Sequence, residues 1–395
     1  MPIKFSTNGL KVFFAAVFVG AMVDGNAATL TLEDAKNLIA EADPESVLQV
    51  KGVTAIQPEA CAVLVGHGPG IDLSVLKAID EPLASVLAKC RGQLMLNGVT
   101  RLTDPCAAIL AECQGHLSLS GLVELRSVSL AKKLASQEVP LILPKVTSLP
   151  PAVADAFGGA KSMPVLDNLE ALESRLLASR LANREGEDLT FSTLHTLSPE
   201  AAAGLASFPC DLRLPALTSL EVSVAQSLAT HRGVLVMDNV STLPPEAFAA
   251  LLGNRGTVGL SRLATLGNEV PTVVLQAIRR HEGMLGLDGL KDISPEVAEA
   301  IRDHRGAVTL TGIRQIPVDV LERLVNSKGD VWIDAITVAP PYLEIKSVLK
   351  HRGPGKIILP EELHELPQEL VQAIQKNPFL CLGNTLGCGA RVRWP

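Results

Sequence analysis

The chain has few aromatic residues: Phe, Tyr and Trp together make up 3% of its 395 residues. Large single cores normally use these rings as bulky filler, so a core of Leu, Val, Ile and Ala predicts thin, uniform layers. Charged residues are also few, at 19% against 47% hydrophobic residues, which excludes an intrinsically disordered chain. The formal net charge of −7 shows no basic footprint and argues against nucleic acid as a partner.

The cysteine pattern excludes two common site classes. Seven cysteines are present and no C-x-x-C occurs, which argues against a thioredoxin-like or zinc-ribbon site. Cys381 and Cys388 are spaced so that a disulfide between them would close a small loop in the C-terminal tail. Cys106 and Cys113 have the same spacing but are expected on one helix, about 10 Å apart along its axis, which is too far for a bridge.

The sequence has no apolar run of the roughly 20 residues that a membrane-spanning helix needs. The run Val12–Val23 follows two lysines and precedes Gly25 and Ala27, small residues at the −3 and −1 positions of a cleavage site. This predicts a signal peptide at residues 1–27 and an exported mature chain; the alternative is an uncleaved signal anchor. Removing two lysines and one aspartate from 35 basic and 42 acidic residues leaves 33 and 41, a mature charge of −8.

A pattern with a period near 23 residues runs through the rest of the chain. Two branched apolar residues flank one spacer, and further apolar residues, a helix start and a glycine follow. Most steps are 23 residues, with exceptions of 24, 25, 27 and 26, so the pattern makes fourteen full repeats and starts a fifteenth. The first apolar residue of each repeat is Leu48, Ile71, Leu94, Leu117, Leu141, Pro164, Leu189, Leu212, Leu235, Val258, Leu285, Val308, Val331, Ile357 and Leu380.

Each part of the repeat predicts a structural element. In Leu285–Leu287 the two leucines alternate with period two, which is typical of a short strand. Gly289 then provides a tight turn. A helix is expected to begin at Ser294-Pro295-Glu296, because the serine can cap it, the backbone of the proline suits the first helical position and the acid complements the helix dipole. Gly306 is expected to end the helix as a C-cap.

One such unit cannot bury its apolar face alone, whereas stacked copies can. Strands separated by a helix run parallel. The predicted fold is therefore an α/β solenoid of about fourteen strand-turn-helix repeats over residues 28–378, with one continuous parallel β-sheet on one face and helices on the other. Residues 379–395 are expected to form a C-terminal cap or tail. Several prolines weaken the pattern over residues 141–188, which predicts a kink or irregular turn there.

The segment Leu235–Gly256 resembles the leucine-rich-repeat superfamily in a divergent, bacterial-type form. Its Leu235, Met237, Leu243, Phe248 and Leu251 are similar to that family's strand leucines, loop leucine and helix residues. The family usually places Asn after the strand and a leucine two residues later, whereas here Val240, Leu290 or Ile313 occupies the ladder position. The resemblance implies a binding or scaffolding role by analogy.

Histidines recur just before the terminal glycine of a repeat, at His67, His231, His281, His304 and His351. A metal ladder is one interpretation. We favour a partly cationic side chain that interacts with the helix dipole and bonds the last carbonyls, because Asn254 and Ser327 fill the same position. No metal site or cofactor is therefore predicted.

Short polar side chains follow the strands, among them Asp238, Asp288, Thr311 and Asp334. Calcium binding is one interpretation. We favour local bonding to turn amides, because carboxylates are too sparse within each turn.

The spacer between the two strand residues should point away from the core and line the exposed sheet face where this family usually binds. That row is mixed and rather apolar, and includes Arg213 and Trp332, residue types that often anchor interfaces. The predicted protein-binding face comprises Arg213, Asp238, Asp288, Thr309, Trp332 and Asp334.

Neither a phosphate-binding loop, a dinucleotide fingerprint, H-E-x-x-H nor G-x-S-x-G occurs. The prediction is an exported, non-enzymatic repeat protein that binds or scaffolds a protein partner through its sheet face. Two alternatives are a self-associating structural protein of the cell envelope or extracellular matrix and an enzyme built on a repeat scaffold.

Overall fold

A computed structural model describes residues 29–183, 188–267, 269–313, 316–333, 348–359 and 368–382. The predicted leader, Asp334 and Cys388 lie outside these residues. The chain divides into two compact units, with the boundary between Leu169 and Glu170. This boundary falls within the proline-rich stretch of residues 141–188, where the kink remains a prediction.

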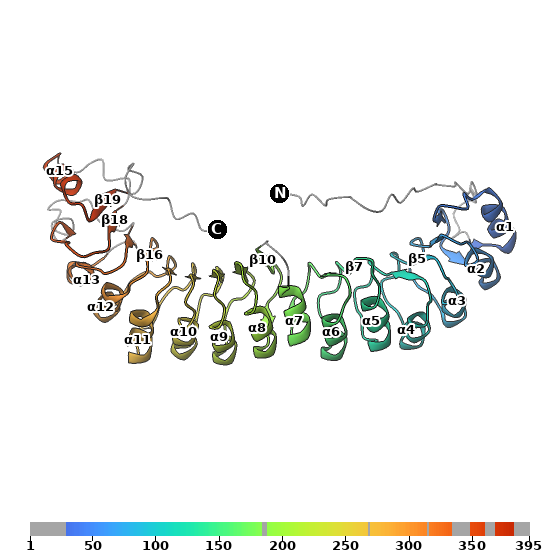
Figure 1. The fold of residues 1–395 in the computed structure, drawn as a ribbon, viewed down its shortest axis with the longest axis horizontal. Coiled ribbons are helices and arrows are strands. Elements are labelled where there is room, and N and C mark those ends of the chain that lie inside the picture. Colours follow the sequence, from blue (N-terminus) through green and yellow to red (C-terminus); the bar gives the residue numbers. More distant parts are fainter. Residues whose placement is uncertain are drawn as a thin grey trace. The chain divides into compact units, whose positions relative to one another are not determined.

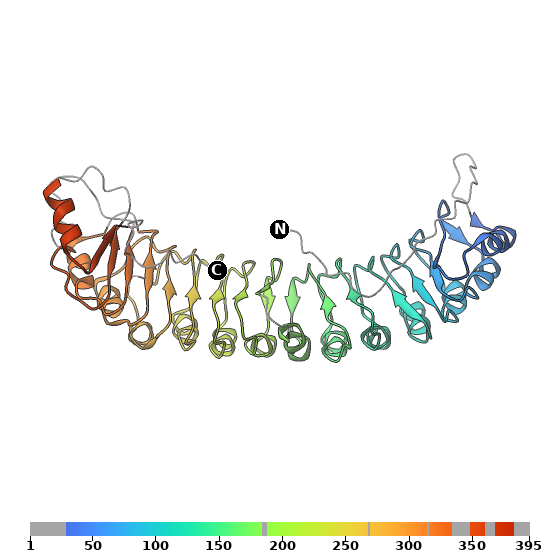
Figure 2. The same ribbon diagram turned by 45° about the horizontal axis from the view of Figure 1, so that its top comes forward.

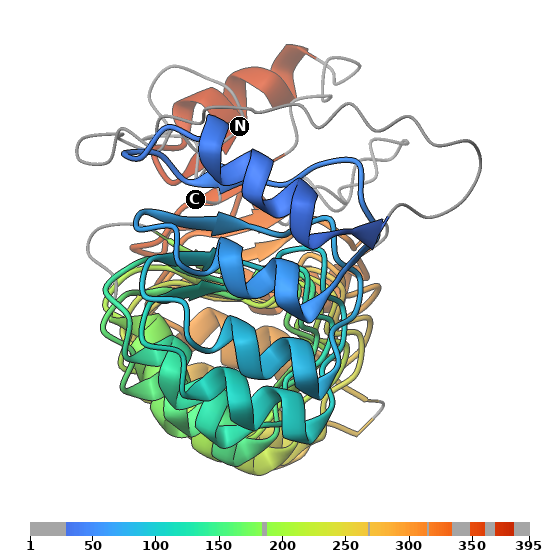
Figure 3. The same cartoon turned by 90° about the vertical axis from the view of Figure 1, so that its right-hand side faces the viewer.

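In the first unit, short strands alternate with short helices (Figure 1). Figure 3 shows its first helices stacked side by side. The elements are β1 (Thr29–Leu30), α1 (Leu32–Glu41), β2 (Leu48–Gln49), β3 (Ala55–Ile56), α2 (Pro58–Leu64), β4 (Gly70–Asp72), α3 (Glu81–Leu87), β5 (Gln93–Met95), α4 (Asp104–Ala111), β6 (His116–Ser118), α5 (Val128–Ala135), β7 (Leu141–Ile142), α6 (Pro151–Gly158) and β8 (Pro164–Val165).

The second unit repeats the same alternation, and Figure 2 shows its strands side by side with the helices on the other side. The elements are β9 (Ala171–Leu172), α7 (Arg175–Ala182), β10 (Leu189–Thr190), β11 (Thr196–Leu197), α8 (Pro199–Leu205), β12 (Leu212–Arg213), α9 (Val222–Leu228), β13 (Leu235–Val236), α10 (Pro245–Leu251), β14 (Val258–Gly259), α11 (Thr272–Arg280), β15 (Leu285–Gly286), α12 (Pro295–Asp303), β16 (Val308–Leu310), α13 (Val318–Leu324), β17 (Val331–Ile333), β18 (Ile357–Leu359), α15 (Gln368–Lys376) and β19 (Leu380–Leu382).

The predicted repeat phase is confirmed, because all fifteen anchor residues lie in strands. Neighbouring strands are parallel, and anchor pairs with anchor: Leu212 with Leu235, and Leu235 with Val258. The last anchor, Leu380, pairs with Ile357, so the sheet continues past residue 378 into the segment expected to be a tail. The α/β solenoid class is therefore confirmed by strand order and register.

The predicted single continuous sheet is wrong, because the repeat strands are divided into sheets of four, two and nine. In the second unit, Leu212 N donates to Val234 O of the next repeat. At the corresponding place in the first unit the chain has Pro140, and Leu117 N donates instead to Oε1 of Gln137. Nε2 of Gln137 also donates to Leu117 O at 3.0 Å. One side-chain amide thus takes the place of the strand that would follow β6.

The core lies between strands and helices and consists mainly of aliphatic side chains. The helix column that shares one phase is at most 1% exposed throughout: Leu64, Leu87, Leu110, Leu228, Leu251, Ile278, Ile301 and Leu324. Three phenylalanines, Phe157, Phe208 and Phe248, are the largest fully buried side chains. None of the helices in the described ranges is long and apolar enough to cross a membrane.

The helices begin with the expected side-chain caps. Two of these caps, at α7 and α1, were not predicted from the repeat pattern. Ser294 accepts from Val297 N, with Pro295 at the first helical position. Ser174 caps α7 in the region where Ser-Pro-Glu is missing. Thr31 and Asp34 form a reciprocal capping box at α1, a helix that precedes the first anchor.

The glycines that end the repeats have a different role from the predicted C-cap. The described glycines with positive φ are Gly52, Gly70 and Gly267, and none of them ends a helix of the repeat. A Cβ on Gly283 would instead lie 1.8 Å from Gly256 O, and one on Gly306 would lie 2.0 Å from Gly283 O. Glycine is needed there because the backbones of successive repeats meet too closely for any side chain.

Candidate functional site

Five of the six residues of the predicted binding face lie in the second unit's sheet or directly after its strands, and Asp334 is outside the described residues. Arg213 and Trp332 are half-buried, and Asp238 is exposed. Register pairs connect Arg213 to Trp332 through the intervening strands β13 to β16. Arg213, Thr309 and Trp332 therefore share one row of one sheet, while Asp238 and Asp288 lie just after strands of that sheet.

The spacer residue, which lies between the two apolar strand residues of each repeat, was expected to be exposed. Only some of the spacer residues are exposed. Ile142 is 47% exposed, whereas Val236 and Thr309 are 3% and 6% exposed. Neighbouring strands lie about 4.8 Å apart, so a large side chain shields a small side chain on the next strand from solvent. Val236 pairs with Arg213, and Thr309 pairs with Trp332. The large members of the row thus cover the small ones.

Polar side chains after the strands form hydrogen bonds between repeats. Ser74 Oγ accepts from Asn97 N at 3.2 Å, and Asn97 Oδ1 accepts from Ser120 N at 3.0 Å. In the second unit Asp288 Oδ1 accepts from the N–H and the hydroxyl of Thr311 at 3.1 and 2.8 Å. The favoured bonding to turn amides is found, but the amide belongs to the next repeat. Among the described residues no group of three or more His, Cys, Asp or Glu is placed to hold a metal ion.

A buried column of side chains follows the helices, and most of these side chains bond backbone groups. His304 is fully buried, with Nδ1 at 2.9 Å from Ile278 O and Nε2 at 3.1 Å from Gly283 O. His281 Nδ1 lies 3.2 Å from Leu252 O, and its ring stacks on His304 with centroids 5.6 Å apart. Asn377 Nδ2 donates to His351 O at 3.1 Å. The column satisfies carbonyls that water cannot reach.

The interpretation of these histidines as partly cationic is wrong for the second unit. Burial lowers the pKa of His231, His281, His304 and His351 below the ordinary 6.5. The neighbouring His281 lowers the pKa of His304 further. The uncharged ring is therefore favoured at pH 7, and His281, His304 and His351 act through hydrogen bonds to backbone groups rather than through the helix dipole.

In the first unit Cys90 and Cys113 occupy the same column, and Cys61 is buried nearby within helix α2. Burial, with a smaller contribution from Cys90, raises the pKa of Cys61 to about 12. Burial likewise raises the pKa of Cys90 and Cys113, and Cys113 Sγ lies 3.5 Å from Cys90 O. Such thiols are protonated and inert. Five described cysteines are free (Cys61, Cys90, Cys106, Cys113 and Cys210), and Cys381 is disulfide-bonded, while its predicted partner Cys388 lies outside the described residues.

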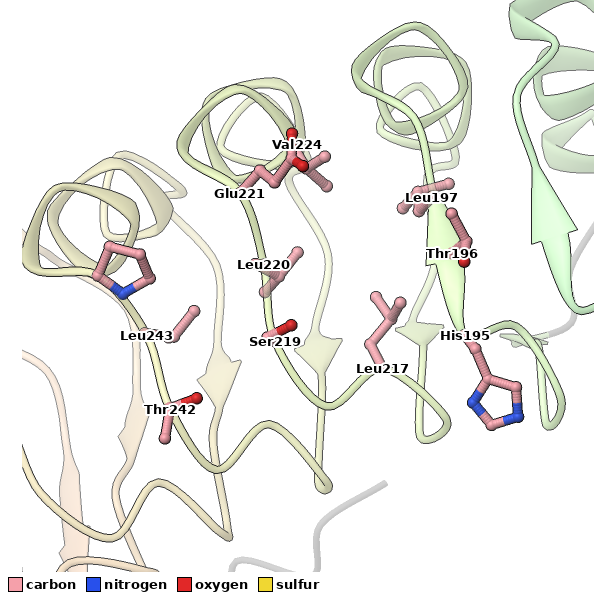
Figure 4. Close-up of a pocket in the computed structure, with 11 residues that line it drawn as sticks. His195, Thr196, Leu197, Leu217, Ser219, Leu220, Glu221, Val224, Thr242 and Leu243 are labelled. Atoms are coloured by element: carbon pink, nitrogen blue, oxygen red, sulfur yellow. The ribbon is translucent and has the colours of Figure 1, made fainter.

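An open cavity in the second unit measures about 650 Å³. Three successive repeats line it, and Figure 4 shows His195 and Leu197, then Leu217 and Leu220, then Thr242 and Leu243. His195 and Glu221 are its titratable lining residues, and His195 Nδ1 lies 3.1 Å from Ala216 O. The lining offers apolar contacts and hydroxyls rather than converging acids and bases.

No family model matches the chain, and no curated protein matches it. Among solved structures, the chain is similar to an internalin (inlF) from Listeria monocytogenes at 14% identity, with a TM-score of 0.28 over 82% of this chain and 88% of that one. It is also similar to a chain of the Drosophila Toll–Spatzle complex at 14% identity, with a TM-score of 0.32 over 80% of this chain and 48% of that one. At such low sequence identities and TM-scores, we draw no conclusion about this chain from these similarities. The leucine-rich-repeat-like architecture is inferred from the chain's own strands and helices.

Proposed function

We propose that this chain is an exported, non-enzymatic module that binds a protein partner through the sheet face of its second unit. The observation that carries the proposal is the placement of Arg213 and Trp332 on one face of one nine-stranded sheet. Both are half-buried, so each keeps some surface for a partner, and Nη2 of Arg213 is buried without a hydrogen-bond partner among the described residues. Trp and Arg are the residue types that most often supply binding energy in protein interfaces.

The residues between these two side chains are small. Val236, Gly259, Gly286 and Thr309 occupy the intervening positions of the same row. All four are buried, so the accessible surface of this row is concentrated at its two ends, on the guanidinium and the indole. A partner would therefore contact the row mainly at these two side chains.

The acidic members of the face differ in availability. Asp238 is exposed and accepts one hydrogen bond, from Ser261 Oγ at 2.8 Å. Asp288 is half-buried and accepts from Thr309 and Thr311, while Thr309 itself is buried. Asp238 is thus the better candidate to receive a basic group from the partner, and Asp288 and Thr309 support the face.

The test is a pull-down with the secreted full chain from its native exterior, comparing Trp332→Ala and Arg213→Ala with Val273→Ala. Val273 lies on α11, on the helix side of the unit, and is 46% exposed, so its replacement removes exposed apolar surface away from the sheet face. The expected result is a partner that is retained by the wild type and Val273→Ala and lost by Trp332→Ala. Equal retention by all variants would contradict binding through the sheet face.

Light scattering during size-exclusion chromatography, over a wide concentration range, separates this proposal from self-association. A monomer throughout leaves the face open for a foreign protein. Growth into dimers or larger species that Trp332→Ala abolishes would show that the partner is a second copy, as a structural protein of the envelope or matrix requires.

Export is a separate part of the proposal and rests on the leader at residues 1–27. Mass spectrometry of the protein recovered outside the cell is expected to give a chain that begins at Ala28. A chain that keeps Met1 and sediments with membranes would instead indicate a signal anchor.

A further inference from the structure

One lateral edge of the second unit is basic from the turn after α9 onward, although the whole chain is acidic and the preceding turn, before β12, holds Asp211 and no basic residue. At this edge each helix ends and the next strand begins. The described segments, here called the basic edge, are Thr230–Gly233, Gly253–Gly256, Arg279–Gly283, Arg302–Gly306, Ser327–Asp330 and Lys350–Lys356. They hold ten basic residues, namely Arg232, Arg255, Arg279, Arg280, Arg302, Arg305, Lys328, Lys350, Arg352 and Lys356. The acids there are Glu282, Asp303 and Asp330, three against ten.

The corresponding places in the first unit carry no such excess. The turns at residues 66–68, 89–92, 112–115, 136–139 and 159–161 hold Lys89, Arg91 and Lys161 against Glu112 and Glu138. The repeat itself therefore does not require basic residues at this position. A net charge of −7 for the chain conceals the local excess in the second unit.

Ion pairs neutralise only part of the basic edge. Asp303 contacts Arg279, Arg302 and Lys328 at 3.7, 3.5 and 3.1 Å. Arg232, Arg255, Arg280 and Arg305 are exposed and form no ion pair with any described residue. These four guanidinium groups remain available to an anion from outside.

The helix dipole does not explain the arrangement fully. Cations in the last helical turn, such as Arg279 and Arg280, complement the dipole. Arg232, Arg255 and Arg305 come after the helices, next to the glycines where repeats stack. A Cβ on Gly256 would lie 2.7 Å from Arg232 O, so Arg232 and Arg255 lie at equivalent positions in adjacent repeats, here called rungs. Like charges on adjacent rungs lower stability, which an anionic partner would offset.

An open cavity lies between the first two of these rungs. It measures about 470 Å³ and is lined by Ala229, Thr230, His231, Arg232, Gly253 and Arg255. Both arginines therefore border one hollow that is wide enough for an anionic group, and guanidinium pairs bind carboxylate, sulfate or phosphate through paired N–H donors.

We propose that the basic edge binds an acidic polysaccharide. Its rungs follow the strand spacing of about 4.8 Å, which is similar to the advance of a polysaccharide per sugar ring, so successive anionic groups can meet successive arginines. The edge segments contain no Phe, Tyr or Trp on which nucleic-acid bases would stack. A row of charges along one edge suits a linear polymer that runs along it. This site is separate from the sheet face and does not depend on the protein-binding proposal.

The test uses the full secreted chain and heparin, a sulfated polysaccharide, with affinity measured over a range of salt concentrations. The variant Arg232→Gln/Arg255→Gln removes two rungs. Its matched control, Arg262→Gln/Lys291→Gln, removes the same charge from exposed residues that follow strands β14 and β15, at the opposite edge. Both variants are checked for the wild-type circular dichroism spectrum.

The expected result is salt-sensitive binding by the wild type and the control, with the slope of log affinity against log salt reduced by roughly one for each edge arginine removed. Equal affinity of the edge variant and the wild type would overturn the proposal, as would equal loss in the control. Edge-dependent binding to anionic phospholipid vesicles or DNA, with heparin left unbound, would overturn it in favour of another polyanion.

Discussion

In the first unit the buried column after the helices contains His67, Cys90, Cys113 and Gln137, whereas in the second unit it contains mostly histidines and asparagines. The thiols make long, weak contacts, such as Cys113 Sγ to Cys90 O at 3.5 Å. The imidazoles make shorter ones, such as His304 Nδ1 to Ile278 O at 2.9 Å. The same position in the repeat thus accepts two chemistries, because its requirement is a small or flat side chain near buried carbonyls.

The two units also differ in how far their sheets continue without interruption. The second unit has nine strands in one sheet, and the first has four and then two, with the side chain of Gln137 at the interruption. Pro140 precedes β7, and Pro164 lies within β8, where it pairs with Leu141. Continuity of a solenoid sheet is therefore a property of each junction between repeats, which one substituted residue can change.

The largest expected loss of stability comes from creating a cavity in the core of one unit. Phe157 in α6 is fully buried, and we expect Phe157→Ala to lower the free energy of unfolding of the first unit by about 3–5 kcal/mol. Phe248→Ala in α10 makes the same change in the second unit, where Phe248 is 1% exposed. Hydrogen exchange followed by mass spectrometry should show lost protection in the mutated unit alone. Loss in both units with either variant would mean that the two units unfold together.

Acid should destabilise the second unit selectively. Because burial lowers the pKa of its histidines, the unfolded chain binds more protons; their stabilisation is present above about pH 6.5 and is lost as the pH falls through the folded-state pKa values. The slope reaches at most about 1.4 kcal/mol per pH unit for each histidine.

The variant His281→Asn/His304→Asn should flatten this dependence, since Asn254 fills the same position naturally. His195→Asn, at an exposed histidine, is the control and should leave the profile unchanged. Urea unfolding followed by hydrogen exchange at several pH values measures both. An acid-sensitive first unit and an insensitive second unit would contradict the assignment of neutral, buried rings.

Removing the amide at the sheet interruption should have an intermediate effect. We expect Gln137→Ala to cost about 1–3 kcal/mol in the first unit, because Leu117 N–H and C=O lose their partner while buried. Gln114→Ala, at an exposed glutamine in the preceding turn, should change the unfolding midpoint little. If the two variants unfold at the same denaturant concentration, the amide does not replace a strand.

The smallest effects are expected at the helix caps, one in each unit. Asp80 accepts from Leu83 N at 2.9 Å and Ser294 from Val297 N at 3.4 Å, so Asp80→Ala should cost more, within about 0.5–2 kcal/mol for each. Glu221→Ala is the reference, because Glu221 precedes α9 without a side-chain cap bond. Thermal unfolding that ranks Glu221→Ala as the most destabilising would show that cap geometry does not control these helices.

Much of the fold was predictable from the order of residues. The spacing of Leu212, Leu235 and Val258 placed the strands and their pairing, because a strand-helix unit of fixed length buries its apolar face only against a copy in the same phase. Helix α1 escaped the pattern because it precedes the first anchor, although Thr31 and Asp34 carry a capping signal. The exposure of the candidate face was less predictable, because the burial of Val236 and Thr309 depends on the size of neighbours in other repeats.

The sequence by itself determined the repeat length, the strand positions and the helix starts, since each depends on residues close along the chain. Tertiary structure decided what the recurring glycines and histidines do. Gly283 lacks a side chain because the carbonyl of Gly256, from the neighbouring repeat, occupies that space. His304 is neutral because stacking removes water from its ring and brings carbonyls from another repeat to its nitrogens. Both roles arise from contacts between residues more than 20 positions apart, and a local pattern carries no record of such distances.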